Sequence, residues 1–437
     1  MTTQLLATRG LRLATARTFR SLRNRNYRLF FSGQLVSLVG TGMQVVAQSW
    51  LVLTLSNSGV ALGVTAALQF APMLVIGVWG GVVADRFDKR RVLIATQVTS
   101  ALLAFVLGLL VVSGAVTLWM VYVLAFLLGL VNVVDLPTRH AFVIEMVGGD
   151  EVPNAVGLNS AVFNTGRLVG PAVAGVLIAS VGVASCFLIN ALSYVPVIAG
   201  LAAMRTEELF RQAPVAAGPG PVRAGLRYVW STPELRSTIL LVAVIGVFGL
   251  NFVVVVPLLA RFVLGGGPRL YGALSSAMAL GSVIGALVAA ARGRPTRRLL
   301  LGGAAAFGLL TMAAAAAPTA LAVGLLLVPT GLALMLFLAT ANTTLQLASD
   351  AAMRGRVMAL YGLVFLGSTP LGGPLMGWVS EQWGARAGLA AGGAVSLAAA
   401  VVAACGEIGR RRRLRSVTVR PADEAGDALD PVATEAV

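Results

Sequence analysis

The sequence predicts an all-α integral membrane protein with 12 transmembrane helices, on three observations. The 437 residues are 57% hydrophobic and only 11% charged, whereas soluble domains hold about 25% charged residues. Uncharged apolar runs reach the roughly 20 residues that a bilayer-spanning helix needs. Basic residues gather in alternate connections, as loops on one side of a membrane do. A β-barrel is disfavoured, because barrel strands alternate apolar and polar residues.

The apolar runs divide into two sets of six on either side of a connection rich in Pro, Gly and Ala. The expected spans are 28–55, 60–84, 92–113, 117–139, 155–180, 183–204, 237–260, 270–291, 299–317, 319–346, 356–380 and 386–406. We therefore expect a basic N-terminal tail (1–27), an N-terminal six-helix bundle (28–204), a linker (205–236), a C-terminal six-helix bundle (237–406) and a disordered tail (407–437).

The charge distribution predicts the orientation of the chain. The net charge is +16, and the basic clusters lie in the N-terminal tail, 86–91, 205–236, 292–298, 354–356 and 410–420. The opposite connections hold only Arg261, Arg269 and Arg386. Because cytoplasmic loops carry the Lys/Arg excess, both termini should be cytoplasmic. The charge thus indicates a lipid bilayer as partner and no nucleic acid, and the Arg- and Ala-rich composition favours the inner membrane of a bacterium.

The two halves resemble each other in sequence. A shift of 202 residues places Gly170 on Gly372 and Gly175 on Gly377. A shift of 207 residues places "RRVL" at 90–93 on "RRLL" at 297–300. Internal similarity between halves is typical of transporters that are built from repeats around a central site. The sequence therefore predicts a duplicated bundle.

The hairpin "GGVVADRFDKRR" gathers charge between the second and third spans. Gly81 lacks a side chain and would allow a neighbouring helix to approach closely. The stretch resembles the signature Gly-x-x-x-Asp-Arg-x-Gly-Arg-Arg of the major facilitator superfamily, matched by Gly81, Asp85, Arg86, Lys89 and Arg90, with Asp88 where the family usually has Gly. The resemblance implies a conformational latch, in which Asp85 packs against the start of the eleventh span near Gly355 and Arg356 in the outward-facing state.

The fifth span carries "GLNSAVFNTGRLVGPAVAG", with small residues and a proline at Gly157, Gly166, Gly170, Pro171 and Gly175. Glycines at these spacings smooth one helix face, and a proline removes a backbone donor and bends the helix. The pattern resembles that of exporters and antiporters in the same superfamily. With "DLPTRHAF" closing the fourth span, the chain resembles the branch of bacterial efflux proteins that contains the enterobactin exporter.

The first span carries a polar stripe, because its polar residues are spaced by three and four and so share one helical face: Gln34, Ser37, Thr41, Gln44 and Gln48. These groups should not face lipid, so the stripe faces either a cavity or another helix. In the resembled fold the first span lines the cavity, which makes Gln34, Thr41, Gln44 and Gln48 candidates for substrate binding. On the fourth span Asn132 forms a shorter stripe with Asp135 and Arg139, and Asn251 and Asn342 are isolated candidates of the same kind.

Asp135, Arg139 and Arg167 are candidates because they fall within expected spans, where ionisable groups are costly and functional by default. Asp135 either pairs with Lys89 or Arg90 as part of the latch, or carries a coupling proton. Arg139 lies four residues later, on the same helical face. Arg167 lies deep in the fifth span, where it would attract an anionic group of the cargo or compensate Asp135.

The sequence shows no catalytic constellation, no metal-ligand spacing and no phosphate-binding loop, so we expect no enzyme, cofactor or metal. The resemblance implies secondary active export of a small organic molecule, a siderophore or a drug-like compound, by proton antiport with alternating access in a functional monomer. The alternatives are uptake of a nutrient by the same fold, and a membrane sensor or assembly factor that does not transport.

Overall fold

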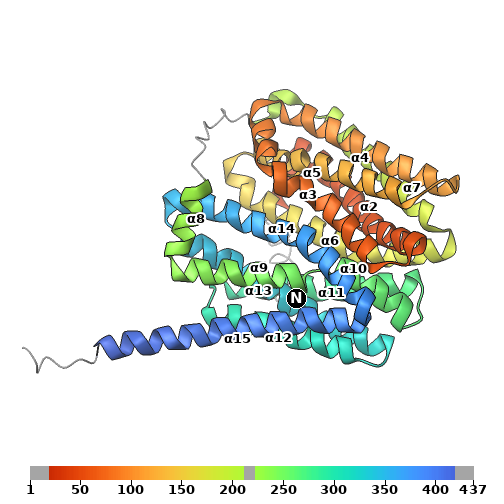
Figure 1. Cartoon of the computed structure of the whole chain (residues 1–437). Coiled ribbons are helices and arrows are strands. Elements are labelled where there is room, and N and C mark those ends of the chain that lie inside the picture. The colour runs from red at the N-terminus through yellow and green to blue at the C-terminus, as the bar shows by residue number, and fades with distance from the viewer. Residues whose placement is uncertain (1–18, 211–221, 419–437) are drawn as a thin grey trace, which may run out of the picture.

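The computed structural model describes residues 19–210 and 222–418, and nearly all regular structure in these ranges is helical. Twelve helical segments in them are long and apolar enough to cross a membrane, which confirms the predicted fold class. The N-terminal half consists of α2 (Arg25–Ser56), α3 (Gly59–Arg86), α4 (Lys89–Val112), α5 (Leu118–Val147), α6 (Val152–Ser180) and α7 (Val183–Ala202). The C-terminal half consists of α9 (Pro233–Gly249), α10 (Phe252–Leu258) with the π-turn Leu259–Val263, α11 (Pro268–Arg292), α12 (Arg297–Ala316), α13 (Ala320–Ala348), α14 (Ala351–Trp383) and α15 (Ala385–Thr418). The two halves lie side by side (Figure 1).

Short polar residues begin several of these helices by accepting a hydrogen bond from a free backbone N–H of the first turn. Ser58 does so for α3, Asp88 for α4 and Thr296 for α12. The seventh span is divided into α9 and α10 at Leu250 and Asn251, and it contains Pro257. The result is a set of membrane-length helices joined by short turns, with one interrupted helix in the C-terminal half.

The contacts of the matched glycines agree with a duplicated bundle. A Cβ on Gly170 would meet Gly42 of α2, the first span, and one on Gly372 would meet Val247 of α9, the seventh span. Gly175 packs against Gly272 of α11, and Gly377 packs against Gly59 of α3. The fifth and eleventh spans therefore make equivalent contacts in their own half and across to the other half.

The connections define two ends of the bundle. We call the end that carries the turn at residues 86–89 the hairpin end, and the opposite one the far end. At the far end one buried apolar cluster includes residues of both halves, among them Val46, Leu51, Val256 and Tyr271. Towards the hairpin end the buried clusters belong to one half each: one contains Phe142 and its neighbours, and two others lie in the C-terminal half.

Direct contacts between the halves are also found at the far end and the middle of the helices. Gly377 and Gly373 of α14 touch Gly59 and Gly63 of α3 near the far end, and Gly367 still meets Leu74. On the other side, the Ser276 hydroxyl of α11 donates to the Leu168 carbonyl of α6 at 2.8 Å. Within the described ranges, no such glycine contact or hydrogen bond joins the halves nearer to the hairpin end than Gly367–Leu74 and Ser276–Leu168. The halves are therefore joined at the far end and separate towards the hairpin end.

Several element bounds differ from the sequence expectation. The fourth span was expected to end at 139, but α5 continues to Val147. The chain after 406 was expected to be disordered, yet α15 is helical to Thr418 and projects beyond the other helices (Figure 1). Within the expected linker, α8 (Val222–Ser231) is a short helix. The remaining parts of the expected tails and linker, 1–18, 211–221 and 419–437, lie outside the described residues.

Candidate functional site

Asp135 is the centre of a buried polar network in the N-terminal half. Its carboxylate accepts hydrogen bonds from the Thr96 hydroxyl at 2.7 Å and from the Gln97 side-chain amide at 2.8 Å, both on α4. Its other oxygen forms an ion pair with Arg139, one turn further along α5. The residue is 2% exposed and lies twelve residues before the end of α5, roughly 18 Å along the helix axis. A charge at this depth is stabilised by its partners rather than by water.

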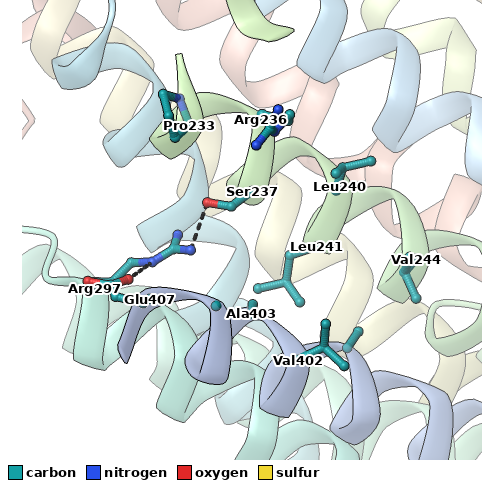
Figure 2. A pocket seen from close by; sticks show the side chains of 12 residues that line it. Pro233, Arg236, Ser237, Leu240, Leu241, Val244, Arg297, Val402, Ala403 and Glu407 are labelled. Carbon is teal, nitrogen blue, oxygen red and sulfur yellow. Dashed lines mark hydrogen bonds and ion pairs between the residues drawn. The ribbon is translucent and has the colours of Figure 1, made fainter. Parts of the chain in front are cut away.

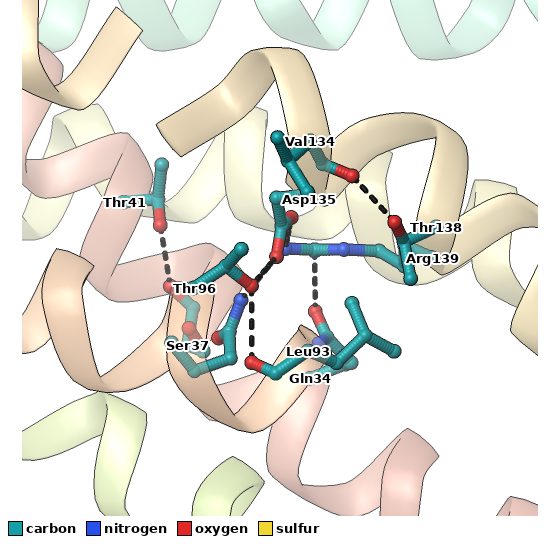
Figure 3. A network of polar contacts seen from close by, with 10 residues as sticks. Gln34, Ser37, Thr41, Leu93, Thr96, Val134, Asp135, Thr138 and Arg139 are labelled. Carbon is teal, nitrogen blue, oxygen red and sulfur yellow. Dashed lines mark hydrogen bonds and ion pairs between the residues drawn. The ribbon is translucent and has the colours of Figure 1, made fainter. Parts of the chain in front are cut away.

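Arg139 connects this carboxylate to the polar stripe of the first span. Its guanidinium donates to the Gln34 side-chain oxygen of α2 at 2.7 Å while it holds Asp135. Figure 3 shows the guanidinium lying between the two. Two buried polar atoms here, Gln97 Oε1 and Arg139 Nε, have no hydrogen-bond partner among the described residues. Unsatisfied buried polar groups are rare in folded proteins, so their presence here marks the network as a candidate functional site.

The partner of Asp135 differs from the sequence expectation of Lys89 or Arg90. The Lys89 ammonium instead binds Glu145 at 2.8 Å, and both side chains are largely buried. Arg90 donates to the carbonyls of Leu201 and Ala202 at the end of α7, at 2.6 and 2.8 Å. The physical reason is depth, because Lys89 begins α4 at the hairpin end whereas Asp135 lies in the middle of α5. In the sequence Arg139 resembles the end of a span, but "HAFVIEMV" continues the helix with apolar residues and brings Glu145 to Lys89.

The expected latch residues are not engaged with the other half in this structure. Asp85 and Arg86 are exposed, and a Cβ on Gly81 would meet nothing within 4 Å. The close helix approach predicted for Gly81 occurs at Gly80, where a Cβ would lie 1.9 Å from the Val133 carbonyl oxygen of α5. Asp88, which replaces the usual glycine of the signature, caps α4 by accepting from the Arg91 amide at 3.0 Å.

The polar stripe of α2 is turned towards other helices of the same half. Gln34 binds Arg139 of α5, Gln44 accepts a hydrogen bond from Asn190 of α7, and Gln48 lies 3.5 Å from Gln69 of α3. All three glutamines are buried, whereas Thr41 is exposed and donates to the carbonyl of Ser37 in its own helix. The sequence left two alternatives for the stripe, a cavity or another helix. The three glutamines contact other helices, and among these four residues Thr41 has an exposed side chain.

The small residues of the fifth span pack as their spacing predicts, with one exception. Gly166 lies against the Leu38 carbonyl of α2, and Gly170 and Gly175 make the contacts described above. Pro171 is buried, and its carbonyl is the nearest atom to a Cβ on Gly272 of α11. Gly157 is exposed, and a Cβ on it would meet nothing within 4 Å.

Arg167 lies on the face of α6 between its contacts with α2 and α11. At 100° per residue, its direction falls between that of Gly170, which meets α2, and that of Pro171, which meets α11. Ala174 shares this face and is fully buried in the cluster common to both halves. Arg167 is exposed, and its guanidinium carbon lies 5.9 Å from the Phe163 ring centroid. Among the described residues no acid pairs with it, so it does not compensate Asp135 here.

The three candidate asparagines are not gathered into one site. Asn132 is half-buried one turn before Asp135 on α5. Asn251 is buried at the break in the seventh span, where its side chain donates to the Val247 carbonyl at 2.6 Å. Asn342 accepts from Gln346 at 2.6 Å on α13. The last two lie in the half opposite Asp135.

Polar groups also close the far end, and the sequence reasoning did not identify them. Glu381 of α14 accepts from the Ser58 hydroxyl at 2.7 Å and from the Val60 amide at 3.1 Å, at the first turn of α3. Arg261 donates to the Leu53 carbonyl of α2 at 3.1 Å and lies over the Trp50 ring. Trp50 stacks on Tyr271 of α11. These contacts tie the two halves together beside the shared apolar cluster.

Comparison with known proteins places this architecture in a family. Residues 16–423 match the family described as transmembrane secretion effector. The staphyloferrin A transporter of Staphylococcus aureus is 28% identical over 59% of this chain and 65% of its own length, which is under two thirds of that relative. The multidrug efflux pump Tap of Mycolicibacterium fortuitum is 27% identical over 82% of this chain and 90% of its own length.

Solved structures share the fold at low sequence identity. The nucleoside transporter NupG aligns with a TM-score of 0.69 and 13% identity, over 87% of this chain and 98% of that one. A bacterial homologue of the human lysosomal transporter Spinster aligns with a TM-score of 0.67 and 15% identity, over 87% and 95%. The chain therefore belongs to the transmembrane secretion effector family of the major facilitator superfamily.

Proposed function

We propose that this protein is a secondary active exporter of a small amphipathic organic molecule, a siderophore or a drug-like compound, coupled to proton entry. The buried Asp135–Arg139–Gln34 chain is the observation that carries the proposal. The names of the two relatives, a multidrug efflux pump and a staphyloferrin A transporter, support cargo of this kind. The proposal places the chain in the inner membrane of a bacterium, with both termini in the cytoplasm and the monomer as the working unit.

In the proposed mechanism, proton coupling would work through the ion pair between Asp135 and Arg139. Deprotonated Asp135 holds Arg139 in an ion pair, and a proton on the carboxylate removes the charge that holds it. Arg139 then keeps only the neutral contact with Gln34 and is free to reorient. Because a buried ion pair is favourable only while both partners are charged, proton uptake changes the stability of the N-terminal half.

The one-sided contact between the halves supports the proposed alternating access. The halves meet at the far end and separate towards the hairpin end, so a cargo molecule would reach the space between them from the hairpin side. Rocking about the α3–α14 and α6–α11 contacts would close that side and bring Asp85 towards the start of α14. Arg167 and Phe163 face the space between the halves and would attract an anionic or aromatic part of the cargo.

The test is proton-driven transport in everted membrane vesicles, with ethidium as the probe. The wild-type chain should accumulate ethidium when the vesicle interior is acidified, and collapse of the gradient should release it. Asp135→Asn should abolish the accumulation while ethidium binding to the purified protein persists. The control is Asp150→Asn, which removes an exposed acid outside the network.

Each alternative predicts a different result in the same assay. A nutrient importer would deplete everted vesicles of its cargo instead of filling them. A sensor or assembly factor would show no flux with any probe, and Asp85→Asn would leave its function intact. Gradient-driven flux that is unchanged in Asp135→Asn would remove Asp135 from the proton-carrying role.

A further inference from the structure

A cavity of about 390 Å³ lies in the C-terminal half, away from the space between the halves. It is enclosed by α9, α12 and α15 where α9 and α12 begin, which is the hairpin end of the bundle (Figure 2). Its volume falls within the roughly 300–1,000 Å³ that is usual for small-molecule sites. All of its lining residues belong to the C-terminal half, so the cavity is separate from the space between the halves.

The charged groups of the cavity leave an excess of positive charge. Arg297 is engaged, because it pairs with Glu407 at 2.7 Å and donates to the hydroxyls of Ser237 and Thr238 at 2.7 and 3.2 Å. Arg236 is exposed at the rim, and within the described ranges no side-chain or backbone acceptor binds its guanidinium. The cavity is thus lined by two guanidiniums and one carboxylate. Glu407 neutralises Arg297, and the positive charge of Arg236 is left over.

The remaining walls are apolar and continue onto the surface of the bundle. Leu241 is buried at the back of the cavity, whereas Leu240 and Val402 are 44% and 71% exposed. On a membrane-spanning helix, exposed apolar side chains of this kind contact hydrocarbon. The cavity therefore joins a cationic head position at the helix ends to an apolar track that runs along the membrane-spanning part of α9 and α15.

We propose that this cavity binds one anionic phospholipid, with the phosphate on Arg236 and an acyl chain along Leu240 and Val402. A guanidinium matches a phosphate with two parallel hydrogen bonds. The sequence of α15 continues directly past the cavity with "RRRRLR" at 410–415, and basic clusters that follow a membrane span attract anionic lipid. Charge complementarity thus selects an anionic head group over a zwitterionic one, and the apolar track selects a lipid over a soluble anion.

The experiment is native mass spectrometry of the full-length protein in detergent. Its probes are phosphatidylglycerol and phosphatidylcholine with identical acyl chains. The wild-type chain should retain one phosphatidylglycerol in preference to phosphatidylcholine. Arg236→Gln should lower phosphatidylglycerol retention about fivefold and remove the preference. The matched control is Arg298→Gln, which removes an exposed arginine of α12 outside the cavity and should leave the preference unchanged.

A second variant tests the apolar track independently of charge. Ala403→Trp would fill the cavity wall and should lower the retention of both lipids; if this variant does not fold, Arg236→Gln decides alone. The proposal is overturned if wild-type protein shows no preference, or if Arg236→Gln keeps it. A third outcome also overturns it: the wild-type protein retains the cation tetraphenylphosphonium, and Ala403→Trp abolishes this retention but leaves lipid binding unaffected. The occupant of the cavity would then be a cationic cargo.

Discussion

Glu381 and Ser58 join the two halves of the molecule at the far end, through a hydrogen bond of 2.7 Å from the hydroxyl to the carboxylate. Ser58 is also the N-cap of α3, so the carboxylate lies at the positive end of that helix. The signature hairpin implies the converse arrangement at the other end of the same helix pair, where Asp85 of α3 would meet the start of α14. In this structure the Glu381 contact is made and Asp85 is exposed, so the latch at the hairpin end stays a prediction.

Loss of the Glu381 carboxylate should weaken closure of the far end. Both hydrogen bonds are exposed to solvent, where a hydrogen bond contributes at the lower end of about 0.5–1.5 kcal/mol, and glutamine keeps one acceptor oxygen. Glu381→Gln should therefore shift the population towards opening at this end by about two- to threefold. Spin labels at Asn57→Cys and Gln382→Cys, both exposed in the wild type, would report the change as longer distances. The background would carry Cys405→Ser, because Cys405 is exposed whereas Cys186 is buried.

An unchanged distance distribution in Glu381→Gln would contradict a closing role for this residue. The control is Asp150→Asn, an exposed acid at the opposite end, which should leave the far-end distances as they are in the wild type.

The Lys89–Glu145 ion pair should contribute to stability far more than an exposed pair does. The two side chains are 16% and 10% exposed, whereas Arg20 and Glu151 form a pair that is 61% and 23% exposed. Removing one partner of a buried pair costs about 3–5 kcal/mol, and exposed pairs contribute about 0–1 kcal/mol. Glu145→Gln should therefore lower the thermal unfolding temperature in detergent clearly more than Glu151→Gln does. Lys89→Met with Glu145→Leu should recover much of the loss, and equal effects of the two single changes would count against the buried pair.

The adjacent glycines Gly80 and Gly81 should respond differently to the same substitution. Gly80→Ala forces a Cβ against the Val133 carbonyl oxygen, whereas Gly81→Ala meets open space. Overpacking of this kind costs about 1–3 kcal/mol, so only Gly80→Ala should lower the unfolding temperature. If Gly81 is the contact surface of the latch, Gly81→Ala should fold normally yet slow transport. A stable Gly80→Ala protein would show that α3 and α5 are not in close contact.

The fold was predictable from the sequence because a bilayer imposes a length and a charge rule on every span. Twelve apolar runs and the basic connections were enough for the helix count and the division into halves, and the glycines of the fifth span indicated where helices touch. The sequence match of Arg90 with Arg297 also agrees with the contacts in the structure. Arg90 binds the end of α7, the last span of its half, and Arg297 pairs with Glu407 of α15, the last span of the other half.

The site was less predictable, because spacing gives the face of a helix but not its neighbour. The glutamines of α2 were correctly placed on one face, but the sequence could not tell that Arg139 and Asn190 occupy it. Glu145 escaped because an arginine inside a helix resembles the end of a span. The closing contact of Glu381 escaped because it joins residues more than 300 positions apart.

The most direct test of proton coupling is infrared difference spectroscopy of the purified protein between alkaline and acidic pH, which needs no cargo. If Asp135 takes up the coupled proton, acidification should produce the C=O band of a protonated carboxyl. This band should appear when the Asp135→Asn spectrum is subtracted from the wild-type spectrum, and also when it is subtracted from the Asp150→Asn spectrum. The Thr96→Val variant, which removes a hydrogen bond to this carboxylate, should shift the band. Wild-type and Asp135→Asn spectra that coincide across the whole pH range would show that Asp135 never takes up a proton and would contradict the mechanism.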